Sequence, residues 1–363
     1  MFKQKCDDFL VYDEATDSYS MPADQQVRDT VEKNKWKDTL FTILKDWRLY
    51  IMLVPMIVVY VLWRYMPMYE LLGCFKNPSI ADSVSDQYWV GLRYFYDIMF
   101  GDAEYSVEFW LAFRNTFVTA FYGLLFGFPV PIILALFFNE VRSNVARNIM
   151  QVCVYLPKFL STVIVTTLAL VLFKGSSSGD YGVVSKLLVW FGVDETLAKA
   201  GLVYTTQYYR GLYVVLDLWE HAGYDSIVFF AAVIAISPTS YEAAQIDGAG
   251  KMQQMRYVVI PSILSTVVIM LIMKIGSLLS VGYEKIYLLM GSNTIALEDG
   301  SYYTTSNYEA ANTVSTWANQ LSDYSDYRQA YGKAAEMLNN LIGMILVIGS
   351  NAIAKRATDV SLY

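Results

Sequence analysis

Acidic and aromatic side chains gather in one largely apolar stretch of the chain, where they could bind a solute. Trp219, Glu220, Tyr224 and Asp225 lie there, close to Asp217. Because Glu220 and Tyr224 are four positions apart, they share one face of a helix. Ionisable residues inside membrane segments usually face an interior or a water-filled cavity, which makes this face a candidate binding surface. A second interpretation is equally open. Trp219 and Tyr224 would belong to an aromatic belt at the membrane interface, and the acids would lie near the outer boundary of the membrane.

Two further polar residues of the apolar segments are weighed in the same way. Lys274 is a second candidate for solute binding, but an ion pair within the helix bundle is the preferred interpretation. His221 is expected to be an interfacial side chain rather than a ligand. Most other charges, including Glu220 and Lys285, are expected near the ends of spans, where long side chains can reach water.

Bond-making chemistry is not indicated by the remaining residues. One histidine in 363 residues nearly excludes His-rich metal sites and Ser-His-Asp catalysis. The cysteines, Cys6, Cys74 and Cys153, are far apart and form no CxxC motif. A net charge of −7 argues against a nucleic-acid partner. The sequence therefore predicts no catalytic residue, no metal site and no cofactor bound by this chain.

The amino-acid composition indicates that membrane-spanning helices position the polar residues described above. The chain is 55% hydrophobic and only 17% charged, whereas soluble domains carry about a quarter charged residues. A membrane-spanning helix needs roughly 20 apolar residues. We therefore expect an all-α membrane protein with about six transmembrane helices, the fifth long enough to be tilted or to lie partly outside the membrane. The predicted spans are about Leu49–Pro67, Asn115–Asn139, Met150–Phe173, Leu212–Ile236, Val258–Met290 and Met337–Ala354.

Orientation follows from the lysines and arginines beside the spans, which concentrate in cytosolic loops. With six spans, all the basic clusters fall on one side of the membrane. They are Lys33 to Arg48, Arg142 with Arg147, Lys251 with Arg256, and Lys355 with Arg356. We therefore expect both termini in the cytosol, and the long loops at about 68–113, 174–211 and 291–336 outside.

Smaller elements are expected in the tail and in the outer loops. Residues 1–46 are interpreted as a cytosolic tail, with an interfacial helix near Val31–Leu44. Trp89–Phe100 and Ala330–Glu336 have helical spacing, whereas Gly175–Gly179 and Ser301–Ser306 have the composition of loop tips. The predicted organisation is tail 1–46, first span and outer loop 47–114, transmembrane core 115–356 and cytosolic tail 357–363.

A short polar loop, YEAAQIDGAG at 241–250, separates the fourth and fifth predicted spans. Ser237 and Pro238 suit a helix start, and Asp247-Gly248 suits a break because glycine tolerates positive φ. A second helix is expected from about Ala249, running into the fifth span. Two small alanines beside Glu242 allow close approach of a partner, so this short helix suits docking. For an arbitrary loop, an ordinary connector would be favoured.

The loop resembles the EAA motif of integral-membrane permeases of binding-protein-dependent ABC importers. In that motif E-A-A is followed after three residues by glycine, and after nine more by I-x-L-P. The matching positions here are Glu242-Ala243-Ala244, Gly248 and Val258-Val259-Ile260-Pro261. Other segments resemble the carbohydrate permeases once named for lipoprotein or polysaccharide transport, namely 45–77, WVGLRYF at 89–95, FWLAFRNTF at 109–117, YLPKFLSTVIV at 155–165 and GYEKIYLLM at 282–290.

This resemblance implies a type I ABC importer permease fold in a bacterial cell membrane, with a cytosolic EAA coupling helix at 238–261. In the family this helix seats in a groove of a cytosolic ATPase dimer, which binds ATP and Mg. The chain's own GAGKM at 248–252 lacks the glycine spacing and the Ser/Thr of a phosphate loop. The coupling residues implied are Glu242, Ala243, Ala244, Asp247, Gly248, Gly250 and Pro261.

The resemblance also implies partners and a solute. The partners are a second, homologous permease, an extracellular solute-binding protein and membrane lipid. The implied solute is a carbohydrate of oligosaccharide size, whose hydroxyls and apolar ring faces match the carboxylates and aromatic rings at 219–225. Two alternatives stay open: an importer permease for peptides or amino acids, and a multi-span membrane glycosyl transferase.

Overall fold

The protein is described here from a computed structural model, which covers residues 11–13, 18–20, 47–77, 87–101, 103–173, 175, 181–296, 302–323 and 327–358. The helix expected at Val31–Leu44 and most of the loop tip at Gly175–Gly179 lie outside these residues. The chain divides into two compact units, Met1–Glu70 and Leu71–Tyr363, which are described separately.

The first unit contains a small hairpin and the first apolar helix. Strand β1 (Val11–Asp13) pairs antiparallel with β2 (Ser18–Ser20). Helix α2 (Trp47–Tyr60) is followed by the π-helical turn η2 (Val61–Tyr65), and the 3₁₀ segment η3 (Met66–Phe75) begins in this unit. The apolar stretch Trp47–Phe75 is long enough to cross a membrane, which confirms the first predicted span.

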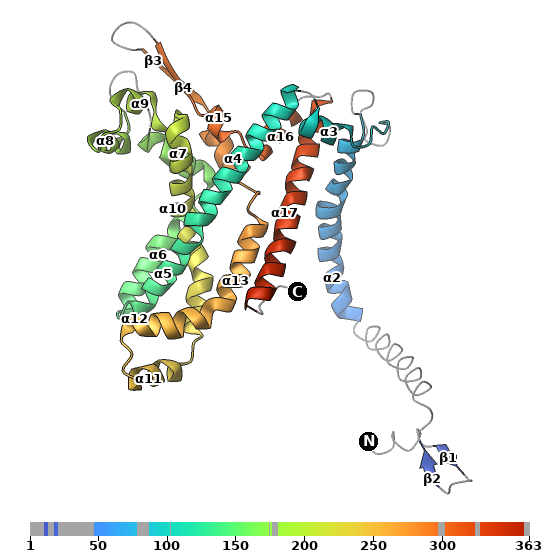
Figure 1. Ribbon diagram of the computed structural model, residues 1–363, viewed down its shortest axis with the longest axis vertical. Coiled ribbons are helices and arrows are strands. Elements are labelled where there is room, and N and C mark those ends of the chain that lie inside the picture. Colours follow the sequence, from blue (N-terminus) through green and yellow to red (C-terminus); the bar gives the residue numbers. More distant parts are fainter. Residues whose placement is uncertain are drawn as a thin grey trace. The chain divides into compact units, whose positions relative to one another are not determined.

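The second unit is almost entirely helical (Figure 1). Its helices are α3 (Arg93–Phe100), α4 (Ala103–Gly127), α5 (Pro129–Glu140), α6 (Asn144–Tyr155), η5 (Leu156–Phe159), α7 (Thr162–Leu172), α8 (Val183–Trp190), α9 (Glu195–Ala200), η6 (Leu202–Tyr204), α10 (Thr206–Ile234), α11 (Pro238–Ile246), α12 (Lys251–Gln254), η7 (Met255–Val259), α13 (Ile260–Gly276), α14 (Tyr283–Leu289), α15 (Tyr308–Ala311), α16 (Val314–Ser322) and α17 (Arg328–Thr358). Its strands are β3 (Ser292–Ala296) and β4 (Tyr302–Ser306), an antiparallel pair.

Length and apolar composition identify the candidate spans among the described helices. Besides the first, Glu104–Glu140, Lys251–Gly276 and Arg328–Arg356 each suffice to cross a membrane. Two bent pairs, α6–η5 with α7 and α10 with α11, qualify only when each pair is taken together, which gives up to six spans. The six-helix prediction agrees with this range.

The helices bend near prolines, which lack a backbone N–H donor, and near a serine that caps the next helix. The 98° bend between Asn144–Phe159 and Thr162–Leu172 follows the buried Pro157 of η5, and Ser161 caps α7 by accepting a hydrogen bond from the Ile164 amide at 3.4 Å. Both π-helical turns, η2 and η7, end two residues before a proline, Pro67 and Pro261 respectively. A proline ring clashes with the carbonyl four residues earlier, and a wider turn relieves that clash.

Several sequence predictions need correction. Helix α10 begins at Thr206, not near Leu212, so Glu220 lies near its middle rather than its end. The stretch Val258–Met290 is not one long span, because α13 ends at Gly276 and α14 is separate. The tip expected at Ser301–Ser306 is mostly strand β4.

The two short helices predicted in the outer loops are present with different bounds. The helix predicted at Trp89–Phe100 starts only at Arg93 and forms α3. Ala330–Glu336 belongs to the start of the much longer α17. Both segments pack at the same end of the unit, so they position the outer loops rather than forming isolated helices.

Two buried apolar clusters hold the unit together. One joins α3, α4, α16 and α17 around Phe109, Trp317 and Tyr331, and the other joins α7, α10, α14 and α15 around Tyr209 and Leu289. Burying each such large side chain stabilises the fold by about 1.5–3 kcal/mol. The second cluster contains residues of both α10 and α14, the two helices whose contact the site depends on.

A buried asparagine connects α4 to both α10 and α15. Asn115 is fully buried, and its amide donates to the carbonyl oxygens of Glu309 at 2.8 Å and Asn312 at 2.9 Å. Its own side-chain oxygen accepts a hydrogen bond from Arg210 at 2.8 Å. Buried polar groups that are fully paired in this way specify one arrangement of the helices around them.

We expect Gly223→Ala to destabilise the packing of α10 on α6. A Cβ atom there would lie 2.1 Å from the carbonyl oxygen of Val154, a backbone atom that cannot move aside alone. Overpacking of this kind costs about 1–3 kcal/mol. The thermal unfolding midpoint of the detergent-purified protein should fall. Gly211→Ala, in the same helix with open space around it, is the control and should not lower the midpoint.

Candidate functional site

The loop at 238–261 forms a short helix that protrudes from one end of the second unit. Figure 1 shows α11 beyond α12, at the end opposite the β3–β4 hairpin. No residue of α11 is buried, and Glu242, Ala243, Asp247, Gly248 and Gly250 are exposed. Ala244 is half-buried, and Pro261 is exposed where the second helix of the loop enters α13.

Local interactions define both ends of this protruding helix. It begins at Pro238 as predicted, but the Ser237 hydroxyl bonds the Thr239 hydroxyl at 2.7 Å instead of capping the backbone. Gly248 has φ +78°, a conformation that favours glycine, and the Ala249 amide donates to the Ala244 carbonyl at 2.9 Å.

Contacts with neighbouring helices orient the loop. Lys251 at the start of α12 pairs with Glu140 at the end of α5. Tyr241 packs on an apolar cluster formed by Val233, Val259 and Ile263. The helix is therefore exposed along its length but anchored at its base, as a docking element requires.

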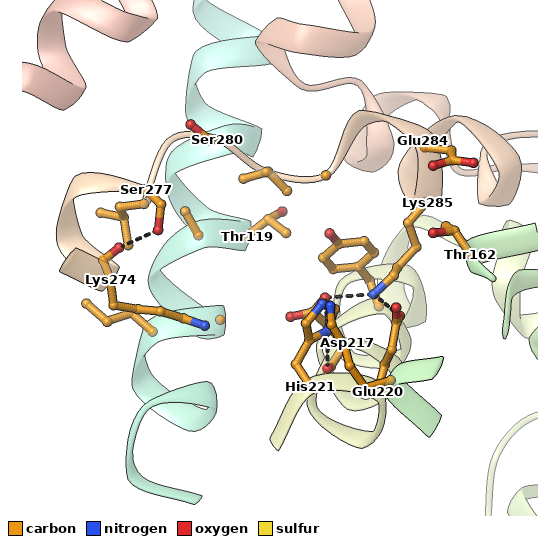
Figure 2. A pocket seen from close by; sticks show the side chains of 18 residues that line it. Thr119, Thr162, Asp217, Glu220, His221, Lys274, Ser277, Ser280, Glu284 and Lys285 are labelled. Atoms are coloured by element: carbon orange, nitrogen blue, oxygen red, sulfur yellow. Dashed lines mark hydrogen bonds and ion pairs between the residues drawn. The ribbon is translucent and has the colours of Figure 1, made fainter. Parts of the chain in front are cut away.

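A polar cavity of about 390 Å³ lies within the helical unit, away from this loop. Figure 2 shows side chains from α4, α7, α10, the end of α13 and α14 around it. Its polar lining consists of Thr119, Lys158, Thr162, Tyr213, Asp217, Glu220, His221, Lys274, Ser277, Ser280, Glu284 and Lys285.

An ion-pair cluster forms one wall of the cavity. The Lys285 ammonium lies 2.7 Å from Asp217 Oδ1 and 2.6 Å from Glu220 Oε2, between which it points in Figure 2. The Lys285 and Glu220 side chains are each only 6% exposed. His221 Nδ1 lies 3.4 Å from the same Asp217 oxygen. Because α14 supplies the cation and α10 the anions, the cluster joins two elements far apart in sequence.

The structure separates the predicted solute-binding residues into two groups. Glu220 and Lys274 line the cavity, and Asp225 pairs with Lys274 at 3.2 Å, the ion pair preferred for Lys274 from the sequence. Trp219 and Tyr224 are 44% and 46% exposed and are not among the cavity-lining residues. Of the pair Glu220 and Tyr224, Glu220 is the residue that lines this cavity.

Sequence reasoning missed several lining residues. Lys285, which was expected near the end of a span, is buried in the ion-pair cluster, and His221 also lines the cavity. One signal in the sequence could have indicated the pairing. Lys285 is a cation in one apolar segment, and Asp217 and Glu220 are acids in another apolar segment, so the two segments could form ion pairs. Within the described ranges, no group of three or more His, Cys, Asp or Glu side chains is placed to hold a metal ion.

Comparison with known proteins identifies relatives along most of the chain. The profile of one family, the binding-protein-dependent transport system inner membrane component, matches residues 127–315. The polygalacturonan/rhamnogalacturonan transport system permease protein YteP of Bacillus subtilis (strain 168) is 31% identical over 332 residues, 92% of this chain and 95% of the relative. Protein LplB of the same bacterium is 31% identical over 319 residues, 88% of this chain and 92% of LplB.

A solved structure has a closely similar chain. It belongs to a bacterial ABC transporter involved in the import of the acidic polysaccharide alginate, and the match has a TM-score of 0.72 at 33% identity. The match covers 90% of this chain and 99% of the other. A second structure, in complex with an alginate pentasaccharide-bound periplasmic protein, matches with a TM-score of 0.69 at 31% identity and the same coverage.

Proposed function

This chain belongs to the family of binding-protein-dependent transport system inner membrane components, and from that premise we propose that it is an ABC importer permease for an oligosaccharide. It is a multi-pass membrane protein with the type I importer permease fold. The observation that carries the carbohydrate assignment is the match to YteP, a permease named for polygalacturonan and rhamnogalacturonan, over 92% of this chain. The alginate importer supports the same class of solute.

The coupling mechanism that we propose uses the protruding helix α11. Glu242, Ala243, Ala244, Asp247 and Gly248 would contact a cytosolic ATPase dimer, while Gly250 and Pro261 set the bends of the loop. ATP and Mg would be bound by that ATPase, since this chain has no phosphate-loop pattern. Closure of the dimer would rock the spans between inward and outward access, and the solute biases these states only by binding them differently.

The assembly follows from the same proposal. A second, homologous permease completes the pathway, and a solute-binding protein docks on the outer loops. Both termini and α11 lie in the cytosol, so residues 1–46 and 357–363 are cytosolic tails flanking the first span and outer loop (47–114) and the transmembrane core (115–356). The exposure of α11 and its anchoring by the Lys251–Glu140 pair support this arrangement.

The cavity is our proposed solute site within this chain. Glu220 and Lys274 would contact the saccharide directly, and Asp225 would hold Lys274 in place. Carboxylates and ammonium groups form charge-assisted hydrogen bonds with hydroxyl groups. Trp219 and Tyr224 do not line this cavity, so their direct contact with the solute is the alternative that the Trp219→Ala variant tests.

The proposed function is tested by uptake in the host cell. Cells in which this chain is deleted should lose uptake of labelled oligosaccharides, and the restored chain should return it. Peptide and amino-acid uptake should be unaffected. If the deletion abolishes uptake of a peptide and leaves every saccharide unchanged, the carbohydrate assignment is wrong.

Trp219→Ala is expected to leave solute-stimulated ATP hydrolysis within about twofold of wild type. Its ring is 44% exposed and outside the cavity lining, and surface changes away from a site have small effects. The measurement is ATPase activity of the reconstituted transporter with its binding protein and saccharide. A tenfold loss would instead place Trp219 in the solute pathway.

A further inference from the structure

The short helix α8 carries an apolar face that the described part of the chain leaves exposed. Val183, Leu187 and Trp190 lie on one side of this helix, because they are four and three positions apart. Phe191 follows directly after the helix. The four side chains are 66%, 54%, 80% and 75% exposed, in chain order. A contiguous apolar surface of this kind indicates contact with a partner or with a membrane.

The other side of α8 is packed against the helical unit. Val184 and Leu188 contact the buried cluster around Tyr209, and Ser185 is fully buried. One face therefore holds the helix in place, which makes the exposed apolar residues a fixed part of the molecular surface.

The start of α8 lies against the end of a membrane helix. Helix α7, the second half of a bent candidate span, ends at Leu172. A Cβ atom at Gly182, directly before α8, would lie 2.2 Å from the Leu172 carbonyl oxygen, so a glycine is needed for this close approach. On α7 itself, Ile164, Leu168 and Val171 form an exposed apolar stripe of the kind that lipid covers. Helix α8 therefore starts at the level where this stripe ends, as expected for the membrane boundary.

A second exposed aromatic surface lies at the same end of the unit. Helix α3 and the residues just before it expose Trp89, Leu92, Tyr96 and Phe100. Figure 1 shows α3 and α8 near the end that carries the β3–β4 hairpin, on opposite sides of the helical unit. The surface of a bilayer meets both sides at once, whereas one folded protein docked on either helix would leave the other uncovered.

We propose that α8 is an interfacial helix, with Trp190 and Phe191 inserted between the lipid headgroups and the acyl chains on the membrane face opposite α11. Tryptophan is enriched at this boundary, where its ring is partly in apolar and partly in wet surroundings. The eight residues of α8 are about 12 Å long, too short to cross the membrane. Lys186 is exposed on the same helix and can extend its ammonium group to the lipid phosphates. This inference requires only that the chain spans a membrane, and it is independent of the solute.

Fluorescence quenching by brominated lipids tests the position of Trp190. The full chain, expressed with its partner subunits, is reconstituted in nanodiscs of phosphatidylcholine and phosphatidylglycerol. The acyl chains carry bromine either near the headgroup or near the terminal methyl group, and the emission of Trp190 is the difference between wild type and Trp190→Phe. We expect this emission to lose most of its intensity with bromine near the headgroup and much less with bromine near the methyl group, because interfacial helices insert by about 5–10 Å.

Trp317 provides the matched control for this measurement. It belongs to the buried cluster at the same end of the unit and is 2% exposed. The difference emission between wild type and Trp317→Phe should therefore keep its intensity in both lipids. Trp190→Phe replaces one exposed aromatic ring by another, so its thermal unfolding midpoint should equal that of wild type.

Two other occupants of the exposed face would give different results. Trp190 emission that neither lipid quenches, but that shifts when the solute-binding protein is added, would assign the face to that protein and overturn the proposal. Emission that lipid quenches in the chain alone but not in the complete transporter would assign the face to the second permease, and would overturn it equally. Neither result affects the importer assignment, which the uptake experiment decides.

Discussion

Replacing Glu242 by arginine is expected to abolish solute uptake while the chain still inserts into the membrane. Glu242 is exposed on α11, and its carboxylate has no ion-pair partner among the described residues. In the proposed complex it meets the ATPase, and reversing a charge at a central interface residue weakens binding by roughly 30-fold or more, about 2 kcal/mol. Uptake and co-purification of the ATPase should fall together.

A charge reversal elsewhere provides the control for this prediction. Glu195 is an exposed acid in α9, at the opposite end of the helical unit (Figure 1), and Glu195→Arg should leave ATPase association unchanged. Membrane levels of both variants are compared by immunoblot. Unchanged uptake in Glu242→Arg would show that α11 does not couple the permease to ATP hydrolysis.

Lys285→Met should destabilise the folded protein by about 3–5 kcal/mol, the usual effect of breaking a buried ion pair from one side. The substitution leaves Asp217 and the 6%-exposed Glu220 side chain without their cation. The thermal unfolding midpoint and the folded yield in detergent should both fall sharply. Adding Asp217→Asn and Glu220→Gln should recover much of the loss, because the stranded charges are then removed.

The second ion pair of the cavity gives a matched comparison. Lys274 and Asp225 are 40% and 30% exposed, so solvent screens their attraction more. Lys274→Met should therefore cost no more than about 1 kcal/mol. If both lysine variants unfold at the same temperature, the buried cluster does not hold α14 against α10.

The features that the sequence predicted well are those encoded over short distances. The segment from Ser237 to Gly250 carries a helix start at Pro238 and a break at Gly248 in one short stretch, and the exposed helix α11 forms there. Apolar runs such as Asn115–Asn139 identify membrane helices because each must satisfy its own backbone hydrogen bonds in lipid. The acids of α10 were recognised as unusual because a charged side chain inside an apolar membrane segment is costly.

Tertiary structure decided which of those polar residues meet. Lys285 reaches Asp217 across 68 positions of sequence, and no local pattern encodes that distance. The break after Gly276 and the bend after Phe159 bring Lys285 and Lys158 to one cavity, whereas Trp219 and Tyr224 do not line it. The sequence alone determined the membrane helices, the exposed helical loop between two of them and the presence of charges in the apolar segments. Their pairing depended on how the three helices α10, α13 and α14 pack, because an ion pair forms only where the fold brings two side chains within a few ångströms.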